Sequence, residues 1–342
     1  MYYDSNDLAV HLPRRGVHWR DSVVQRTLWT MFTHHHLLYN DNPPFSEGKE
    51  WRTRAGLGHA KGVLAFNEAF QGFWLMHSLP EWPVPHPGHE WAIHNRTQAQ
   101  HMLCARVDEG TVRVAANALV FMNAVVYRLS TNENRDDEGP AGEANWHRPA
   151  SRISTERVIE WLTMRGLTLP MNPADAFSPC PSETDWPRGF APRRDRAKVG
   201  CGMIGGEFRY FVQQSDEQGL GFRFHDWLSL QLYQGSPFYW HSRLKSVLHS
   251  LPVGPVLTRD SEGVLVDDAQ WIAFFDGSQR YAVPTHRDHS KWGTDGVSFC
   301  IGSLNRVSMH QKRGGEALCT SNRGLVNFMA PRLLDSQGSA LF

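Results

Sequence analysis

Two short motifs, each with a histidine and a lysine separated by one residue, constrain the fold of this 342-residue chain more than any other feature. The first is His59-Ala60-Lys61 and the second is His289-Ser290-Lys291. Residues two apart in a β-strand point to the same face, so an extended His-x-Lys motif directs an imidazole and an ammonium into one space. One such motif arises often by chance, whereas one in each half indicates a shared site if the halves fold alike.

The sequence after both motifs predicts the same local structure, a strand, a turn and a second strand. The second strand of the first half covers 73–78, and that of the second half covers 297–301. Polar residues stand where these strands end, Ser78 in the first half and Ser303 in the second. We expect these strand ends to return to the face that carries the His-x-Lys motifs.

Strands and helices alternate along the rest of the chain, which favours a layered α/β fold. The hydrophobic spacing predicts helices at 22–32, 153–162, 224–232 and 322–334, the last ended or kinked by Pro331, and strands at 208–212, 238–240 and 271–275. The apolar stretch 112–129 does not separate helix from strand, and the polar segments 132–145 and 169–198 are expected to be loops. We divide the chain into an N-terminal half, residues 1–150, and a C-terminal half, residues 151–342, with one motif each.

The charge balance bears on the class of partner. Lys+Arg and Asp+Glu each number 35, so the formal charge at pH 7 is zero, which is unusual for a protein that binds DNA through a basic surface. Protonation of all 18 histidines would raise the charge to at most +18 in acid, since histidine titrates in this range. Whether the histidines share that task or are ordinary surface and core residues stays open.

The sequence shows no membrane span and no targeting signal. No apolar stretch approaches the length that crosses a bilayer. The opening, Met1-Tyr2-Tyr3-Asp4, lacks the basic and apolar regions of a signal peptide. We expect no membrane association, and export would require a signal that was removed or lies upstream.

Other motifs give little support to a metal or a cofactor. The run 34–36 is three histidines near the end of a predicted helix, and a solvated helix end is favoured over a metal site because no carboxylate partner is visible. None of the five cysteines forms a Cys-x-x-Cys pair. The G-x-G-x-x-G pattern at 200–205 follows a basic loop, not the apolar strand that a dinucleotide site needs. The basic run 193–198 is a solvated charge run or a phosphate-contacting patch, with the former favoured.

The paired motifs, followed by Gly302-Ser303-Leu304-Asn305, resemble the phospholipase D superfamily, and within it the chain resembles the deoxyribonuclease II family. The matching blocks are 37–44, 58–64, 72–80 and 288–292, then Asn305-Arg306 and Arg313-Gly314-Gly315 before Leu318-Cys319. They extend at intervals over nearly the whole chain, with the weakest match at 133–198. The resemblance fits a bacterial member of the family.

The resemblance implies a phospholipase D-like α/β fold of two pseudo-twofold-related halves, each with a mixed β-sheet flanked by helices, and one site at their junction. It implies an endonuclease that acts on double-stranded DNA without metal or cofactor, works best in acid and leaves 3′-phosphate and 5′-hydroxyl ends. The implied catalytic residues are His59, Lys61, His289 and Lys291, and the implied supporting or phosphate-binding residues are His77, Ser78, Ser303 and Asn305.

These residues suit cleavage of a phosphodiester. One neutral histidine attacks phosphorus, and the other, protonated, donates its proton to the leaving 5′ oxygen and then activates the water that releases the product. Lysine neutralises the non-bridging oxygens. We place the nucleophile at His59 and the acid at His289, although the similarity of the two motifs leaves this assignment open.

The resemblance also implies a disulfide between Cys300 and Cys319, hence an oxidising, secreted or periplasmic location.

The chain differs from the family pattern in two places. The first motif's strand ends at Asn67 and Glu68 where the family has an aspartate, and Ser303 replaces another aspartate. The pairing of the remaining cysteines and the oligomeric state, possibly a homodimer, stay open.

Two other functions fit the same core residues. A relative that acts on phospholipid would differ only in the groove around the site. An inactive relative would bind DNA without cutting it, although the intact His59, Lys61, His289 and Lys291 argue against that alternative.

Overall fold

A computed structural model gives the fold of this chain. It describes residues 2–4, 9–11, 22–44, 56–83, 100–130, 152–170, 172, 175, 177, 199–204, 206–215, 224–232, 236–242, 251–252, 264–269, 271–276, 279–284, 287–335 and 337–342. The loop expected at 132–145, the basic run 193–198 and Cys180 lie outside these residues.

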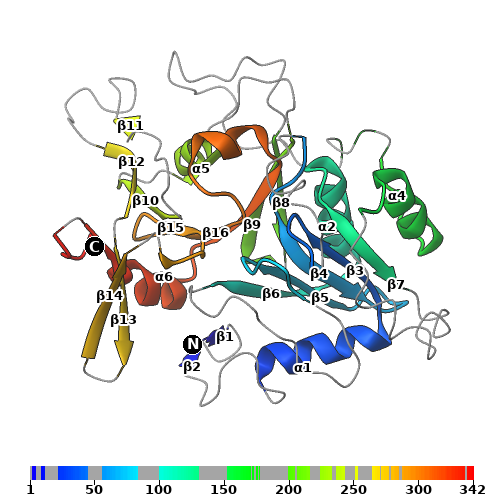
Figure 1. The fold of residues 1–342 in the computed structure, drawn as a ribbon, viewed down its shortest axis with the longest axis horizontal. Coiled ribbons are helices and arrows are strands. Elements are labelled where there is room, and N and C mark those ends of the chain that lie inside the picture. Colours follow the sequence, from blue (N-terminus) through cyan, green and yellow to red (C-terminus); the bar gives the residue numbers. More distant parts are fainter. Residues whose placement is uncertain are drawn as a thin grey trace.

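The first sheet has five strands in the order β6-β5-β4-β3-β7 (Figure 1). They are β3 His35–Asn40, β4 Lys61–Phe66, β5 Gly72–His77, β6 Met102–Val107 and β7 Val126–Ser130. The strand, turn and strand predicted after the first motif are β4 and β5. Every pair in the sheet is antiparallel. The expected mixed sheet is therefore wrong for this half, because a short turn such as that between β4 and β5 can join only antiparallel strands.

Helices cover both faces of the first sheet, which explains why its strands are continuous apolar runs. Side chains alternate between the faces. Leu38 and Val63 pack with Leu28 of α1 (Val23–Thr30), whereas Leu37 and Leu64 pack in the cluster that contains α2 (Glu109–Phe121). The ambiguous stretch 112–129 is therefore the body of α2 followed by β7.

The second sheet has eight strands in the order β11-β12-β10-β15-β16-β17-β9-β8. They are β8 Val199–Ile204, β9 Phe208–Gln213, β10 Phe238–His241, β11 Leu251–Pro252, β12 Val264–Asp268, β15 Trp292–Thr294, β16 Phe299–Gly302 and β17 Gly315–Thr320. Among the described strand pairs of this sheet, only β10 and β12 are parallel, so the sheet is mixed as expected. The strand, turn and strand predicted after the second motif are β15 and β16, and α5 (Phe224–Leu232) packs on the sheet through Trp227 and Leu228.

The remaining elements flank the two large sheets. A three-stranded sheet contains β13 Trp271–Asp276, β14 Gln279–Pro284 and β18 Leu333–Leu334, and β1 Tyr2–Asp4 pairs with β2 Ala9–His11. The other helices are α4 Thr155–Met164 and α6 Arg323–Met329, with short 3₁₀ turns at Met31–Thr33, Ser308–Lys312 and Ala330–Arg332. Pro331 ends the last helix, as predicted. Among the described helices, none combines the length and apolar character needed to cross a membrane.

The three-histidine run 34–36 differs from its prediction. It is not a solvated helix end, because α1 stops at Thr30 and strand β3 begins at His35. His35 and His36 are buried, and His35 Nε2 lies 2.7 Å from the carboxylate of Glu68, a partner that the local sequence did not reveal. No described group of three or more His, Cys, Asp or Glu residues is arranged to hold a metal ion.

One hydrophobic cluster joins the halves, and a carboxyl group is buried at its centre. The cluster combines α2 and the first sheet with β8 and β9 of the second. Glu316 of β17 accepts hydrogen bonds from Tyr39 Oη of β3 (3.4 Å) and Tyr210 Oη of β9 (2.8 Å). Trp74 Nε1 in turn donates to Tyr39 Oη. Burial raises the pKa of Glu316 to about 7, so this link between the sheets is uncharged in acid.

The first prediction concerns the disulfide between Cys300 of β16 and Cys319 of β17, which the structure confirms. Replacing both residues by alanine should lower the free energy of unfolding by about 3 kcal/mol, because the crosslink no longer restricts the unfolded chain. Urea unfolding measures the change. Cys104→Ala is the control, since Cys104 is a free cysteine. A double variant as stable as the wild type would contradict the prediction.

The second prediction concerns Glu316. Its folded pKa lies near 7, above the ordinary glutamate value of 4.5, so folding favours the protonated form. The stability from this group is fully present below pH 4.5 and is lost as pH rises towards 7, by on the order of 3 kcal/mol. Glu316→Gln, which cannot ionise, should remove this part of the pH dependence. Unfolding from pH 4.5 to 8 tests it, with Glu160→Gln on the exposed side of α4 as control. An unchanged pH slope in Glu316→Gln would contradict the assignment.

Candidate active site

The first motif lies where β4 begins, against the end of α2. His59 precedes the strand and Lys61 is its first residue, so the motif stands at the strand's entrance and not within it. His59 N donates to Gly314 O at 2.7 Å. A Cβ atom at Gly314 would stand 2.1 Å from Met122 O, closer than any side chain can approach. Glycine at 314 thus allows the chain before β17 to hold His59 against the end of α2.

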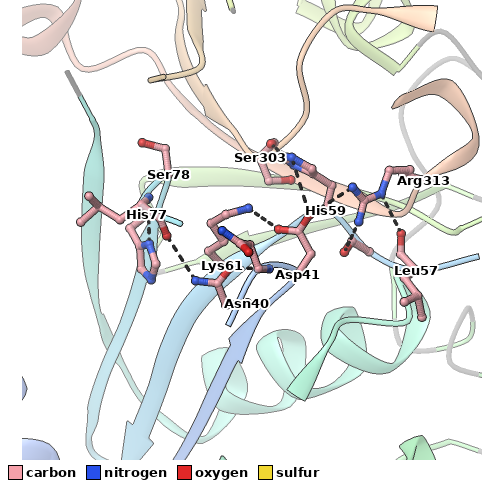
Figure 2. Close-up of polar contacts among 12 residues, drawn as sticks. Asn40, Asp41, Leu57, His59, Lys61, His77, Ser78, Ser303 and Arg313 are labelled. Atoms are coloured by element: carbon pink, nitrogen blue, oxygen red, sulfur yellow. Dashed lines mark hydrogen bonds and ion pairs between the residues drawn. The ribbon is translucent and has the colours of Figure 1, made fainter. Parts of the chain in front are cut away.

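A buried carboxylate, Asp41, organises the cations around the first motif. Lys61 Nζ donates to Asp41 Oδ1, and Arg313 Nη1 lies 3.1 Å from Oδ2 (Figure 2). Burial opposes ionisation of Asp41, but the charges of Lys61 and Arg313 outweigh it and lower the pKa of the carboxyl group. His59 Nε2 lies 3.8 Å from Asp41 Oδ2. Asp41 therefore fixes the position of Lys61 and borders the ring of His59.

The two motif histidines form hydrogen bonds with opposite halves of the chain. His59 Nδ1 lies 2.8 Å from the carbonyl oxygen of Ser303, directly after β16. His289 Nδ1 lies 2.7 Å from the carbonyl oxygen of Ser78, directly after β5. A carbonyl oxygen can only accept, so each Nδ1 carries a proton and donates it. Each neutral ring then has its lone pair at Nε2, the form required for attack on phosphorus or acceptance of a proton.

The second motif is held by the charged and polar groups around it. Asp288 Oδ1 accepts from Ser290 N at 2.7 Å, and Asp288 Oδ2 lies 3.4 Å from His241 Nε2. Lys291, 1% exposed, donates from Nζ to the carbonyl oxygen of His289 at 2.5 Å. His101 Nδ1 accepts from Lys291 N at 3.0 Å. The whole second motif precedes its strand, β15, whereas Lys61 of the first motif is the first residue of β4.

The supporting residues expected from the resemblance lie around these motifs. Ser78 and Ser303 meet the motif histidines through their carbonyl oxygens, not their hydroxyl groups. His77 is buried, and its Nδ1 accepts from Leu79 N at 3.1 Å. Burial and the charge of Lys61 lower the pKa of His77 well below its ordinary value. Asn305 donates from its backbone nitrogen to His310 Nδ1 at 2.9 Å, and its buried Oδ1 has no described hydrogen-bond partner.

The electrostatics of the site keep a proton off His59. Burial lowers its pKa most, and the charges of Lys61, Arg313 and Lys291 lower it further, well below the ordinary histidine value. His59 therefore stays neutral in mild acid, where an isolated imidazole would be protonated. A neutral imidazole with its lone pair at Nε2, beside a buried ammonium, can act as a nucleophile towards a phosphate.

Sequence reasoning did not consider His310, and it noted Asp41, Asp288 and Arg313 only within matching blocks, without a role in the site. The contact of Asp41 with Lys61 depends on the pairing of β3 with β4, which sets Asn40 opposite Lys61. One signal in the sequence could have pointed to Asp41. It is a polar residue directly after the apolar strand β3, which pairs with the strand that follows the first motif. His310 and Arg313 follow the second motif by about twenty residues, and no spacing rule brings them to the first motif.

Comparisons with known proteins fit this arrangement. The family model of deoxyribonuclease II matches residues 1–168 and 270–337. Plancitoxin-1 from Acanthaster planci is 34% identical over 334 residues, which cover 94% of this chain and 78% of that protein. Deoxyribonuclease-2-alpha of Mus musculus is 26% identical over 288 residues, 83% of this chain and 67% of that protein.

A bacterial relative supports the expectation of a bacterial member. The putative deoxyribonuclease-2 of Burkholderia thailandensis is 26% identical over 303 residues, which cover 87% of this chain and 68% of that protein. The family model covers more than half of the 342 residues, including both His-x-Lys motifs. The chain therefore belongs to the deoxyribonuclease II family, a family of hydrolytic nucleases.

Proposed function

We propose that this protein is an endonuclease that hydrolyses double-stranded DNA to 3′-phosphate and 5′-hydroxyl ends, without metal, through a phosphohistidine intermediate and best in mild acid. One observation carries the proposal. The Nδ1 atoms of His59 and His289 donate to the carbonyl oxygens of Ser303 and Ser78, so the neutral form of each ring carries its lone pair at Nε2. Two such imidazoles are what a double displacement at phosphorus requires.

The reaction has two steps, and protons balance in each. His59 Nε2 attacks phosphorus, the bond to the 5′ oxygen breaks, and protonated His289 gives its Nε2 proton to that oxygen. His289, now neutral, takes a proton from water as the water attacks the phosphohistidine. The 3′-phosphate leaves, His59 regains its lone pair, and His289 is protonated for the next cycle.

The environment of His59 supports its assignment as the nucleophile. The nucleophile must be neutral at the pH where the acid is charged, and the burial and cationic neighbours of His59 lower its pKa well below the ordinary value. The bell-shaped rate that two histidines produce then has its acid limb below the ordinary histidine pKa of about 6.5. An optimum in mild acid follows.

The lysines supply the positive charge that a phosphate needs. Lys61 is 4% exposed and Lys291 is 1% exposed, so both ammonium groups act where water screens little. We assign Lys61, Lys291 and Asn305 to the non-bridging oxygens. A phosphate at Lys61 would share that ammonium with Asp41, which holds Lys61 in place between substrates.

The crosswise contacts also favour two related halves, 1–150 and 151–342, with the pseudo-twofold relation running through the site. Ser78 after β5 and Ser303 after β16 take equivalent places, one in each half.

We propose an oxidising, secreted or periplasmic location, since the disulfide between Cys300 and Cys319 is the kind of bond that persists there.

The third prediction tests the reaction itself. Supercoiled plasmid should be nicked between about pH 4 and 6 in excess EDTA, because lysines and histidines, not a metal ion, act on the phosphate. End analysis should show that the cut strands accept label at the 5′ end directly, but at the 3′ end only after phosphatase treatment. Loss of nicking on chelation, restored by a divalent ion, would refute the mechanism. Release of a lipid headgroup without nicking would refute the substrate.

The fourth prediction separates the two histidines. His59→Ala and His289→Ala should each lower kcat on DNA by at least about 10³-fold, because the two rings act as one unit. With thymidine 3′-(p-nitrophenyl phosphate), whose leaving group needs no proton, His289→Ala should still release one equivalent of nitrophenolate in a burst. His59→Ala should give no burst. His34→Ala, at a partly exposed histidine after α1, is the control. A burst in His59→Ala but not in His289→Ala would reverse the assignment.

A further inference from the structure

A third histidine, His310, lies against the ring of His59. The two ring centroids are 4.3 Å apart, with the planes inclined by 43°. His310 belongs to the short 3₁₀ turn Ser308–Lys312, between β16 and β17, and is partly exposed. None of the steps described above uses this side chain.

The backbone fixes the proton of His310 on the opposite nitrogen from that of His59. Asn305 N donates to His310 Nδ1 at 2.9 Å. The amide can only donate, so Nδ1 is an acceptor and the single ring proton lies on Nε2. A second proton would have to displace this hydrogen bond. The hydrogen bond at Nδ1 therefore favours a neutral His310 that can donate from Nε2, whereas His59 presents its lone pair at Nε2.

The surroundings of His310 oppose its protonation as well. Burial lowers the pKa of His310 most, and the charges of Arg313, Lys291 and Lys61 lower it further against the opposing charge of Asp41. The same lysines and arginine surround His59. His310 thus stays neutral in the acid range and shares the space into which a phosphate must come.

The Nε2–H group of His310 is available to a ligand. No described residue accepts a hydrogen bond from Nε2, although the turn holds the ring by its other nitrogen. Neutral donors fixed before the substrate arrives are the groups that stabilise charge developing on an oxygen in a transition state. Protein groups that already face that oxygen need little rearrangement during the reaction.

We propose that His310 is a substrate-contacting residue whose Nε2–H donates to a non-bridging oxygen of the scissile phosphate while His59 attacks. The ring transfers no proton, so the proton balance between His59 and His289 is unchanged. This inference rests on the proposed function and adds to it a neutral donor beside the cations Lys61 and Lys291.

Two substitutions separate this role from a structural one. Glutamine at 310 can place an amide N–H near the position of Nε2 but loses the acceptor for Asn305 N. Asparagine can accept from Asn305 N near the position of Nδ1 but has no donor that reaches as far as Nε2. The two variants are similar in size and polarity, and neither can titrate.

The fifth prediction compares these variants by kcat and KM on plasmid DNA, with thermal unfolding as a check of folding. His310→Asn should lower kcat by about 10²–10³-fold, the usual loss of one such donor. His310→Gln should stay within about 10-fold of the wild type and keep the acid limb of its pH profile. An active Asn variant with an inactive Gln variant would show that His310 only holds the Asn305 turn. Loss of activity in both would equally overturn the role of a neutral donor.

One further variant keeps this inference distinct from the proposed function. His310→Phe retains a ring to pack on His59 but has no donor, and it should be as slow as His310→Asn. Full activity in His310→Phe would overturn the inference and leave the mechanism of His59 and His289 intact. Full activity in His59→Ala would instead overturn the proposed function.

Discussion

The candidate active site depends on two hydrogen bonds that cross between the halves of the chain. His59 Nδ1 donates to the carbonyl oxygen of Ser303, and His289 Nδ1 donates to that of Ser78. Each bond sets the orientation of one ring and the nitrogen that carries its proton, so neither half by itself defines the tautomer of its own histidine. The hydrophobic cluster shared by α2 and both sheets, and the bonds from Tyr39 and Tyr210 to Glu316, keep the distances between the halves short enough for these bonds.

Burial strengthens the interactions among the charged groups around His59. Asp41 is 2% exposed, Lys61 is 4% exposed and Arg313 is 2% exposed, so their mutual attraction is weakly screened and the loss of one partner would leave an unpaired buried charge. The same cations lower the pKa of His59. Asp41 thus holds together the positive charge that a phosphate needs and keeps it beside a histidine that stays neutral because of that charge.

The sequence predicted local structure well and contacts between distant segments poorly. Short apolar runs predicted the strands on either side of each turn, and the helix predicted at 224–232 has those bounds as α5. The histidines at 34–36 were misplaced because the helical spacing of α1 leads directly into β3, with no break to mark the change. The sequence assigned no role to Asp41 or His310, because they reach His59 through strand pairing and through a turn between β16 and β17. No spacing along the chain encodes such contacts.

The histidine count is also a poor guide to behaviour in acid. Burial lowers the pKa of His36 to about 4 and of His101 and His225 to about 3, so these rings add no charge in mild acid. The gain of positive charge in acid is accordingly smaller than eighteen histidines allow. These three are ordinary core histidines and take no part in a shared gain of charge. In mild acid these buried rings therefore exclude protons and do not collect them. His77, His101 and His310 accept backbone hydrogen bonds at Nδ1, so the neutral form of each ring carries its proton at Nε2, and a second proton would have to displace the hydrogen bond.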